Sequence, residues 1–291
     1  MAIPAGIRAV DLMMAVPASD SVKEWYDPMR PLFMDEQSRN FEMPAKYMFL
    51  GIPDLSAVTD FPAYIVEQMD RHNIAVSMIG LDESPFGAEV RRRYPDRFVF
   101  DVAVNPNLGM EEVRRIKRVH KEYPGVKAVS FFPSGTYPQV PINDKKAYPI
   151  YATCAELGLP IFINAGVPGP RVPMAPQKTE LLDEVCWFFP EVNFIMRHGA
   201  EPWDELAVKL MLKWPNLYYS TSAFAPKHYP KSVIQFANTR GADKIMYAGY
   251  FPMGLSLDRI FKELNDIPFK DEVWPKFLHD NAARVLKLAP R

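Results

Sequence analysis

The sequence has little cysteine and no long apolar run. Its two cysteines, Cys154 and Cys186, both lie in stretches with helical periodicity, so we predict small core side chains and neither a disulfide nor a metal-ligand pair. So few cysteines are typical of a reducing compartment, and no basic region followed by an apolar stretch opens the chain, so we expect a cytoplasmic protein. Because no run of about 18 apolar residues occurs, we predict no membrane-spanning helix.

The chain also lacks an excess of charge of either sign. Its 34 Lys and Arg residues balance 35 Asp and Glu residues, for a net charge of −1, and the longest basic run is Arg91-Arg92-Arg93. We expect these arginines to be solvated at the C-terminal end of a surface helix, where cations interact favourably with the helix dipole. Nucleic acid is therefore not a predicted partner.

Sequence motifs for common cofactors and nucleophiles are missing as well. There is no Gly-x-Gly-x-x-Gly for a dinucleotide, no Gly-x-Ser-x-Gly around a nucleophilic serine, and no Cys-x₂-Cys or His-x-His pair for a metal. We therefore predict a protein without a bound cofactor.

The sequence does contain a regular alternation of short β-branched runs and longer helical stretches. We predict strands at residues 7–12, 74–81, 98–104, 126–132, 159–164, 192–198, 217–221 and 244–248. Eight such repeats predict a single-domain α/β fold over residues 1–291, a (β/α)₈ TIM barrel. The irregular, proline-bearing segment from the first strand to about Ser56 predicts a long functional loop or lid. Residues 272–288 predict a helical tail packed on the outside of the barrel.

Five segments of the chain resemble the amidohydrolase-related family, typified by aminocarboxymuconate semialdehyde decarboxylase and the γ-resorcylate decarboxylases. In sequence order they are Asp11-Leu12-Met13-Met14-Ala15, Ile161-Phe162-Ile163-Asn164-Ala165-Gly166, Phe194-Ile195-Met196-Arg197-His198-Gly199, Tyr247-Ala248-Gly249-Tyr250-Phe251-Pro252 and Asn281-Ala282-Ala283-Arg284. The resemblance covers nearly the whole chain. It implies a metal-dependent hydrolase or decarboxylase barrel, and it also implies a homodimer, with Trp187, Phe188 and Trp203 as interface candidates.

The residues at the family's metal-binding positions differ in this sequence. The resemblance places Met13 and Ala15 at two histidine positions, Asn164 at a third and Tyr250 at an aspartate position. A zinc-type ion needs three or four histidine, thiolate or carboxylate ligands. We therefore predict that no transition metal is bound.

The remaining polar residues suggest acid–base chemistry at the carboxyl ends of the strands, where barrel enzymes place their active sites. His198 matches the family's catalytic histidine, and an imidazole near its reference pKa both takes and gives a proton at neutral pH. Asn164 and Tyr250 would hydrogen-bond a substrate oxygen, and Glu201 fits either an orienting role or a helix start. By strand alternation, Arg197 is expected to point away from the barrel axis into a buried ion pair. Asp11 is expected to support the strand end.

Apolar residues near the same strand ends are expected to form the substrate walls, namely Met13, Met14, Phe132, Phe224 and Phe251. The sequence thus predicts a metal-independent enzyme that hydrolyses, or cleaves a carbon–carbon bond of, a small aromatic or alicyclic substrate, decarboxylation included. Two alternatives stay open at this point. One is a catalytically silent barrel that binds a small molecule or a partner subunit, and the other is a metal hydrolase with an unforeseen ligand set.

Overall fold

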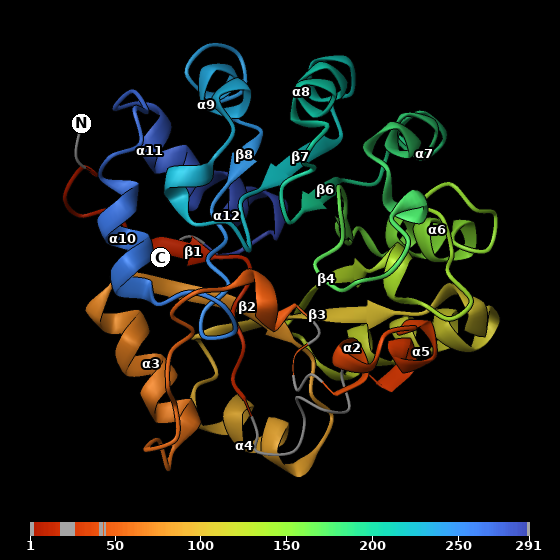
Figure 1. Ribbon diagram of the computed structural model, residues 1–291, viewed down its shortest axis with the longest axis horizontal. Helices are drawn as coiled ribbons and strands as arrows, with labels where there is room; N and C mark the ends of the chain where they lie inside the picture. Colours follow the sequence, from red (N-terminus) through yellow and green to blue (C-terminus); the bar gives the residue numbers. More distant parts are fainter. Residues whose placement is uncertain (1–2, 18–26, 41–42, 44, 290–291) are drawn as a thin grey trace.

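The computed structural model describes residues 3–17, 27–40, 43 and 45–289. Within them, eight parallel strands in the order β1 to β8 form one curled sheet with helices between the strands (Figure 1). The strands are β1 (Ala9–Asp11), β2 (Ile74–Gly80), β3 (Phe98–Val104), β4 (Val126–Phe131), β5 (Ile161–Asn164), β6 (Phe194–Arg197), β7 (Leu217–Ser220) and β8 (Ile245–Met246). The predicted (β/α)₈ barrel is therefore confirmed.

Backbone hydrogen bonds between the residues that follow the first strand and those that follow the last strand close the barrel. The Leu12 N–H donates to the Tyr247 carbonyl at 3.4 Å, and the Tyr250 N–H donates to the Met13 carbonyl at 2.9 Å. The Ala15 N–H also donates to the Phe251 carbonyl at 3.1 Å. The residues that follow β1 and β8 are thus held side by side at one end of the barrel.

Helices surround the strands on the outside of the barrel. They are α3 (Phe61–Arg71), α4 (Pro85–Arg93), α5 (Met110–Glu122), α6 (Tyr148–Leu157), α7 (Leu182–Phe188), α8 (Asp204–Lys213), α9 (Lys231–Ala237) and α10 (Leu257–Leu264). None of the helices in the described ranges is long and apolar enough to cross a membrane. Cys154 on α6 and Cys186 on α7 are free and buried, as predicted for core side chains.

The apolar core has two layers, and strand alternation assigns residues to them. On β3, Phe98, Phe100 and Val102 belong to the large cluster between strands and helices. Val99, which points the other way, belongs to a second cluster inside the barrel, together with Phe162 and other inward residues. Membership of these two clusters shows which side chains face the barrel interior.

The C-terminal tail is helical, as predicted, but it does more than cover the outside. It consists of α11 (Val273–Pro275), a π-helical turn at Lys276–Asp280 and α12 (Asn281–Val285). Ala282, Val285 and Leu286 join the cluster of the barrel interior. The tail therefore closes one end of the barrel.

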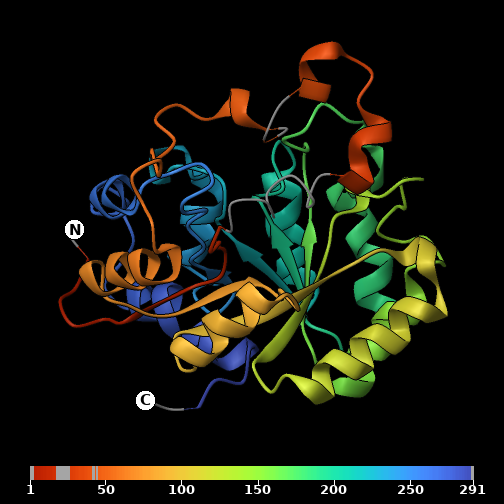
Figure 2. The same ribbon diagram turned by 90° about the horizontal axis from the view of Figure 1, so that it is seen from below.

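The described parts of the long segment after β1, which include residues 27–40 and 45–56, lie across the other end of the barrel, over the carboxyl ends of the strands (Figure 2). It contains α2 (Glu36–Asn40) and the short 3₁₀ helix η2 (Lys46–Met48). The Tyr47 hydroxyl donates to the Gly169 carbonyl at 2.7 Å, and the Phe49 ring stacks on the Tyr250 ring with centroids 5.4 Å apart. This placement over the barrel mouth fits the lid predicted from the sequence.

Candidate functional site

His198 and Tyr250 come together at the mouth of the barrel. Their rings meet edge to face with centroids 5.4 Å apart. Ser222, which follows β7, fixes the imidazole, because its Oγ lies 2.9 Å from Nδ1 and also accepts the His198 backbone N–H at 3.1 Å. This role of Ser222 was not predicted from its position after a strand.

Backbone strain is concentrated around the same group of residues. His198, Ala200, Ala223 and Tyr250 have φ values of 64°, 105°, 71° and 93°, a region that residues with a Cβ rarely adopt. They lie within four residues of the ends of β6, β7 and β8. Such strain persists only where the surrounding structure enforces it, and it is characteristic of functional sites.

The electrostatic environment of His198 differs from the expected one. Burial, reinforced by the positive charge of Arg197, lowers the pKa of His198 to about 3. The expectation of an imidazole near its ordinary pKa is therefore wrong for the free protein. At neutral pH His198 is uncharged, so it can accept a proton but holds no second proton to give.

Arg197 points into the barrel, which corrects the orientation expected from alternation with His198. Its Nη2 donates to Asp101 Oδ2 at 3.2 Å, and its guanidinium lies 5.2 Å from the centre of the Phe162 ring. An ion pair between β6 and β3, which are not neighbours in the sheet, crosses the interior. The alternation fails because the left-handed backbone at His198 turns that residue back toward the mouth. The buried ion pair itself was predicted.

Asn164 ends β5 and lies next to Arg197 in the strand register. Because Phe162 faces the barrel interior, Asn164, two residues later, faces the same side. Asn164 is 8% exposed, and its side chain makes no hydrogen bond within the described part of the chain. The amide is therefore free to bind an oxygen at the mouth.

Glu201 lies near this group without contacting the imidazole. Its backbone carbonyl accepts the Val167 N–H at 2.9 Å, and no hydrogen bond joins its carboxyl group to any described residue. Burial raises the pKa of this carboxyl group, and Asp204 adds to the rise. Ser222 therefore holds the position next to His198 Nδ1, the orienting role that the sequence suggested for Glu201.

The predicted apolar wall residues divide between the mouth and the outer layer. Phe224 lies against Gly199, beside His198, and Met13 belongs to the interior cluster. Phe132 is half-buried after β4. Met14 and Phe251 are buried in the outer layer between strands and helices. The structure thus brings Phe224 and Met13 to the mouth but places Met14 and Phe251 in the core.

Asp11 ties the first strand to the last. Its Oδ1 accepts the backbone N–H groups of Met13 and Gly249, both at 2.9 Å. Burial raises the pKa of Asp11 to about 6, although these hydrogen bonds oppose the rise. Since the carboxyl group binds its proton more tightly in the folded state, it stabilises the fold below about pH 4, and that contribution is lost as the pH rises to about 6.

We therefore expect Asp11→Asn to flatten the pH dependence of stability between pH 4 and 6. The rise of the Asp11 pKa from 3.8 to about 6 corresponds to about 3 kcal/mol in the free energy of unfolding, because each pKa unit is worth about 1.4 kcal/mol. The amide oxygen still accepts the two N–H groups. Urea denaturation at several pH values measures the effect. If the free energy of unfolding changed with pH in the same way in the wild type and in the variant between pH 4 and 6, the carboxyl group of Asp11 would be ionised in the folded protein.

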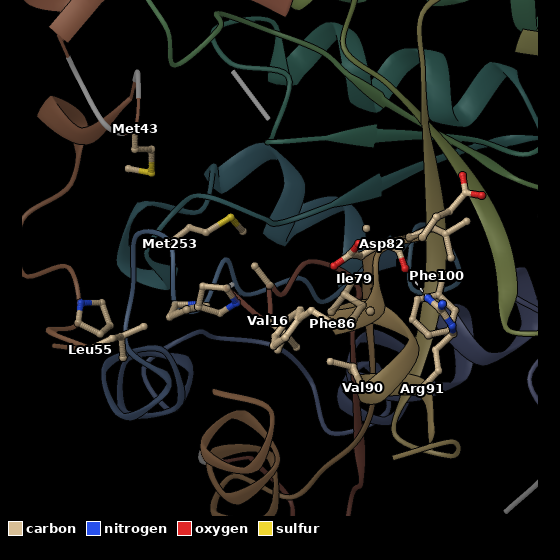
Figure 3. Close-up of a pocket in the computed structure, with 18 of the residues that line it drawn as sticks. Val16, Met43, Leu55, Ile79, Asp82, Phe86, Val90, Arg91, Phe100 and Met253 are labelled. Carbon is tan, nitrogen blue, oxygen red and sulfur yellow. Dashed lines mark hydrogen bonds between the residues drawn. The ribbon is translucent and has the colours of Figure 1, made fainter. Parts of the chain in front are cut away.

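A cavity of about 530 Å³ lies to one side of this mouth. It extends from Met253, after β8, to Phe86 and Val90 on α4, with Val16 and Leu55 on its walls (Figure 3). The walls are mostly apolar, and Lys46, Asp82, Glu83 and Arg91 add charged groups. Its size and lining are those of a small-molecule site.

Arg91 lines this cavity instead of being solvated, which corrects the expectation for this member of the basic run, whereas Arg92 is exposed as expected. Its Nη1 donates to the Asp82 carbonyl, and its guanidinium lies 4.7 Å from the centre of the Tyr123 ring. Arg93 instead pairs with Asp60 at 2.7 Å. The cavity was not predicted, because its walls come from segments far apart in the sequence.

The residues at the family's metal-binding positions do not fit a divalent ion. Among the described residues, no three His, Cys, Asp or Glu side chains gather closely enough to hold one. A thioether, a methyl group, an amide and a phenol stand at the four positions, at Met13, Ala15, Asn164 and Tyr250.

Comparison with known proteins establishes the family. An amidohydrolase family model matches residues 43–288, so the chain belongs to the amidohydrolase family, as the sequence motifs predicted. No curated protein matches the chain in sequence.

Solved structures share the fold over nearly the whole chain. An uncharacterised TIM-barrel protein from Bordetella bronchiseptica is 22% identical, with a TM-score of 0.76 over 96% of this chain and 98% of that one. The 5-carboxyvanillate decarboxylase of Sphingomonas paucimobilis is 15% identical, with a TM-score of 0.69 over 98% and 100% of the two chains. A 2,6-dihydroxybenzoate decarboxylase in complex with 2,6-dihydroxybenzoate is 16% identical, with a TM-score of 0.58 over 96% and 98%. Identities this low show a common fold.

Proposed function

We propose that the protein is a metal-independent enzyme that hydrolyses, or cleaves a carbon–carbon bond of, a small aromatic or alicyclic substrate, decarboxylation included. The main support is the uncharged imidazole of His198, held by Ser222 against Tyr250 at the mouth of the barrel. The family and the two decarboxylases with the same fold support these reaction classes. The apolar walls of the neighbouring cavity support a ring-bearing substrate.

In the proposed mechanism, His198 is the base. When Nδ1–H donates to Ser222 Oγ, Nε2 is left to accept a proton from water or substrate and to return it later. The Asn164 amide and the Tyr250 hydroxyl would donate hydrogen bonds to the oxygen on which negative charge develops. Burial raises the pKa of Tyr250 to about 12, so the phenol keeps its proton at neutral pH.

The second candidate is a barrel that binds a small molecule without transforming it. Phe49 stacks on Tyr250 and covers the mouth, which favours a closed binding site over open access to His198. The same contact is compatible with catalysis if the segment around Phe49 moves aside to admit substrate. A measurement of turnover distinguishes the enzyme from the binding protein.

The test is an assay of metal-analysed, chelator-treated protein on a panel of aromatic and alicyclic esters, lactones and carboxylic acids. Proton release reports hydrolysis, and carbon dioxide release reports decarboxylation. We expect turnover of at least one compound, unchanged by the chelator. Turnover that appears only after addition of manganese or zinc would contradict the metal-independent mechanism, and binding without turnover would favour the silent barrel.

We also propose that two copies of the chain associate. Trp187 and Phe188 at the end of α7 are 65% and 54% exposed, and adjacent exposed aromatic residues are common in interfaces. Trp203, the third interface candidate, is partly buried. Sedimentation velocity at micromolar concentration should give a dimer, and Trp187→Ser/Phe188→Ser should shift it toward the monomer. A single 33.3 kDa species for the wild type would exclude the dimer.

A further inference from the structure

A second cavity, of about 400 Å³, lies at the end of the barrel opposite the mouth. Its walls include Val76, Val99 and Lys127, near the starts of β2, β3 and β4, together with Leu288 of the tail. The starts of parallel strands gather at the amino end of a barrel. Figure 2 shows the tail, in dark blue, at this end and the segment after β1, in orange, at the other. The cavity is therefore separate from His198 and from the reaction proposed there.

The inner wall of this cavity is apolar. Val10, Ala75, Val76 and Val99 are buried and belong to the cluster of the barrel interior, and Leu288 packs against the same cluster. An apolar group that entered the cavity would contact these side chains and be removed from water, which favours binding.

The outer wall carries more positive than negative charge. Among the described residues that line the cavity, Arg8, Lys127 and Lys287 are cations, His279 adds an imidazole, and Asp96 is the single carboxylate. The side chains of Arg8 and Lys127 form no hydrogen bond or ion pair with any residue that the structure describes. Two cations without a counter-ion thus stand beside an apolar surface.

Lys287 occupies a backbone position that glycine usually takes. It follows α12 with a φ of 51°, and the next N–H, that of Leu288, donates to the Ala283 carbonyl at 2.9 Å, as in a Schellman turn. A side chain with a Cβ is strained in this conformation, so a lysine there indicates a use for its side chain. Its Nζ donates to the Gly158 carbonyl at 2.8 Å, which uses one of three N–H donors. Within the described ranges the other two have no partner.

We propose that this cavity binds a small phosphate monoester, with Arg8, Lys127 and Lys287 on the phosphate and the organic group against the apolar inner wall. A phosphate monoester carries about two negative charges at neutral pH and offers three acceptor oxygens. Three cations match this group better than they match a carboxylate, which has one charge and two oxygens. Hydrogen bonds from guanidinium and ammonium groups to phosphate are about twice as strong as neutral ones.

The experiment is isothermal titration calorimetry with phenyl phosphate, inorganic phosphate and benzyl alcohol at millimolar concentration. We expect phenyl phosphate to bind about tenfold more tightly than inorganic phosphate, because burial of the ring adds to the affinity. Benzyl alcohol has a ring but no charge and should not bind measurably. No binding of phenyl phosphate would overturn the proposal. Equal affinity for phenyl phosphate and inorganic phosphate would show general attraction of anions and would overturn it as well.

Paired substitutions locate the phosphate. Arg8→Gln/Lys127→Gln removes two side chains without a described partner, so the fold should persist and the affinity for phenyl phosphate should fall about tenfold. The matched control is Lys231→Gln/Arg240→Gln, which removes two exposed cations on and after α9 and should leave the affinity unchanged. Undiminished affinity in the first double variant would place the phosphate elsewhere. An equal loss in both would show an effect of net charge alone, and either result would contradict the proposal.

Lys287→Gly tests the contribution of the tail. Glycine adopts the left-handed conformation without strain, so the melting temperature should stay close to that of the wild type while the affinity for phenyl phosphate falls several-fold. A lysine retained only for its bond to Gly158 would give the opposite result, a lowered melting temperature with unchanged affinity. That result would remove Lys287 from the proposed site.

Discussion

Replacing His198 with asparagine should lower turnover by about 10² to 10⁴, the usual contribution of an acid–base group, and leave the fold intact. Asparagine is a suitable replacement because His198 has a left-handed backbone with φ of 64°, which asparagine adopts more readily than most residues. Its amide can also take over the hydrogen bond to Ser222. The melting temperature should therefore change little.

The measurement pairs steady-state kinetics with thermal unfolding. Ser222→Ala is the matched control, since it keeps the imidazole but removes its hydroxyl partner, and it should lower turnover less than His198→Asn does. A strongly lowered melting temperature for His198→Asn with ligand binding intact would favour a structural histidine in a silent barrel. Unchanged turnover would remove His198 from the mechanism.

Removing only one charge of the interior ion pair should be strongly destabilising. Arg197→Gln leaves Asp101 buried and unpaired, which typically costs about 3–5 kcal/mol. Arg197→Gln/Asp101→Asn should recover most of that loss, because no unpaired charge then remains inside the barrel. Urea denaturation of the wild type, both single variants and the double variant gives the coupling between the two residues.

The result depends on both side chains being enclosed, as their 8% side-chain exposure indicates. Lys213→Gln is a useful comparison, because its pair with Asp183 is half exposed and should cost less than about 1 kcal/mol. Additive effects of the two interior substitutions would show that Arg197 and Asp101 do not interact.

The sequence predicted the barrel because parallel strands buried on both faces have a recognisable pattern. Six of the seven residues of β2 are buried and nearly all are apolar, so the sequence showed both the strand and its length. β8 is shorter than predicted, because the Tyr247 N–H bonds to the Phe277 carbonyl of the tail instead of continuing the sheet. A contact between residues so far apart in the sequence leaves no local pattern.

The sequence predicted which residues of the candidate site lie together, but it did not predict how they are arranged. His198, Asn164 and Tyr250 follow strand ends, so their common location followed from the fold. The direction of Arg197 was wrong because strand alternation assumes regular backbone, and the left-handed conformation at His198 interrupts it. The pKa of His198 could not be predicted either, because it depends on burial and on that same arginine.

The most direct test of the central claim is an NMR titration of the His198 ring in the free protein. The chain has five histidines, and the spectrum of His198→Asn assigns the resonance. If an uncharged imidazole beside a fixed positive charge acts as the base, the His198 shifts should stay constant from pH 8 to below pH 5, consistent with a pKa of about 3. A midpoint near the ordinary histidine value of about 6.5 would contradict this site.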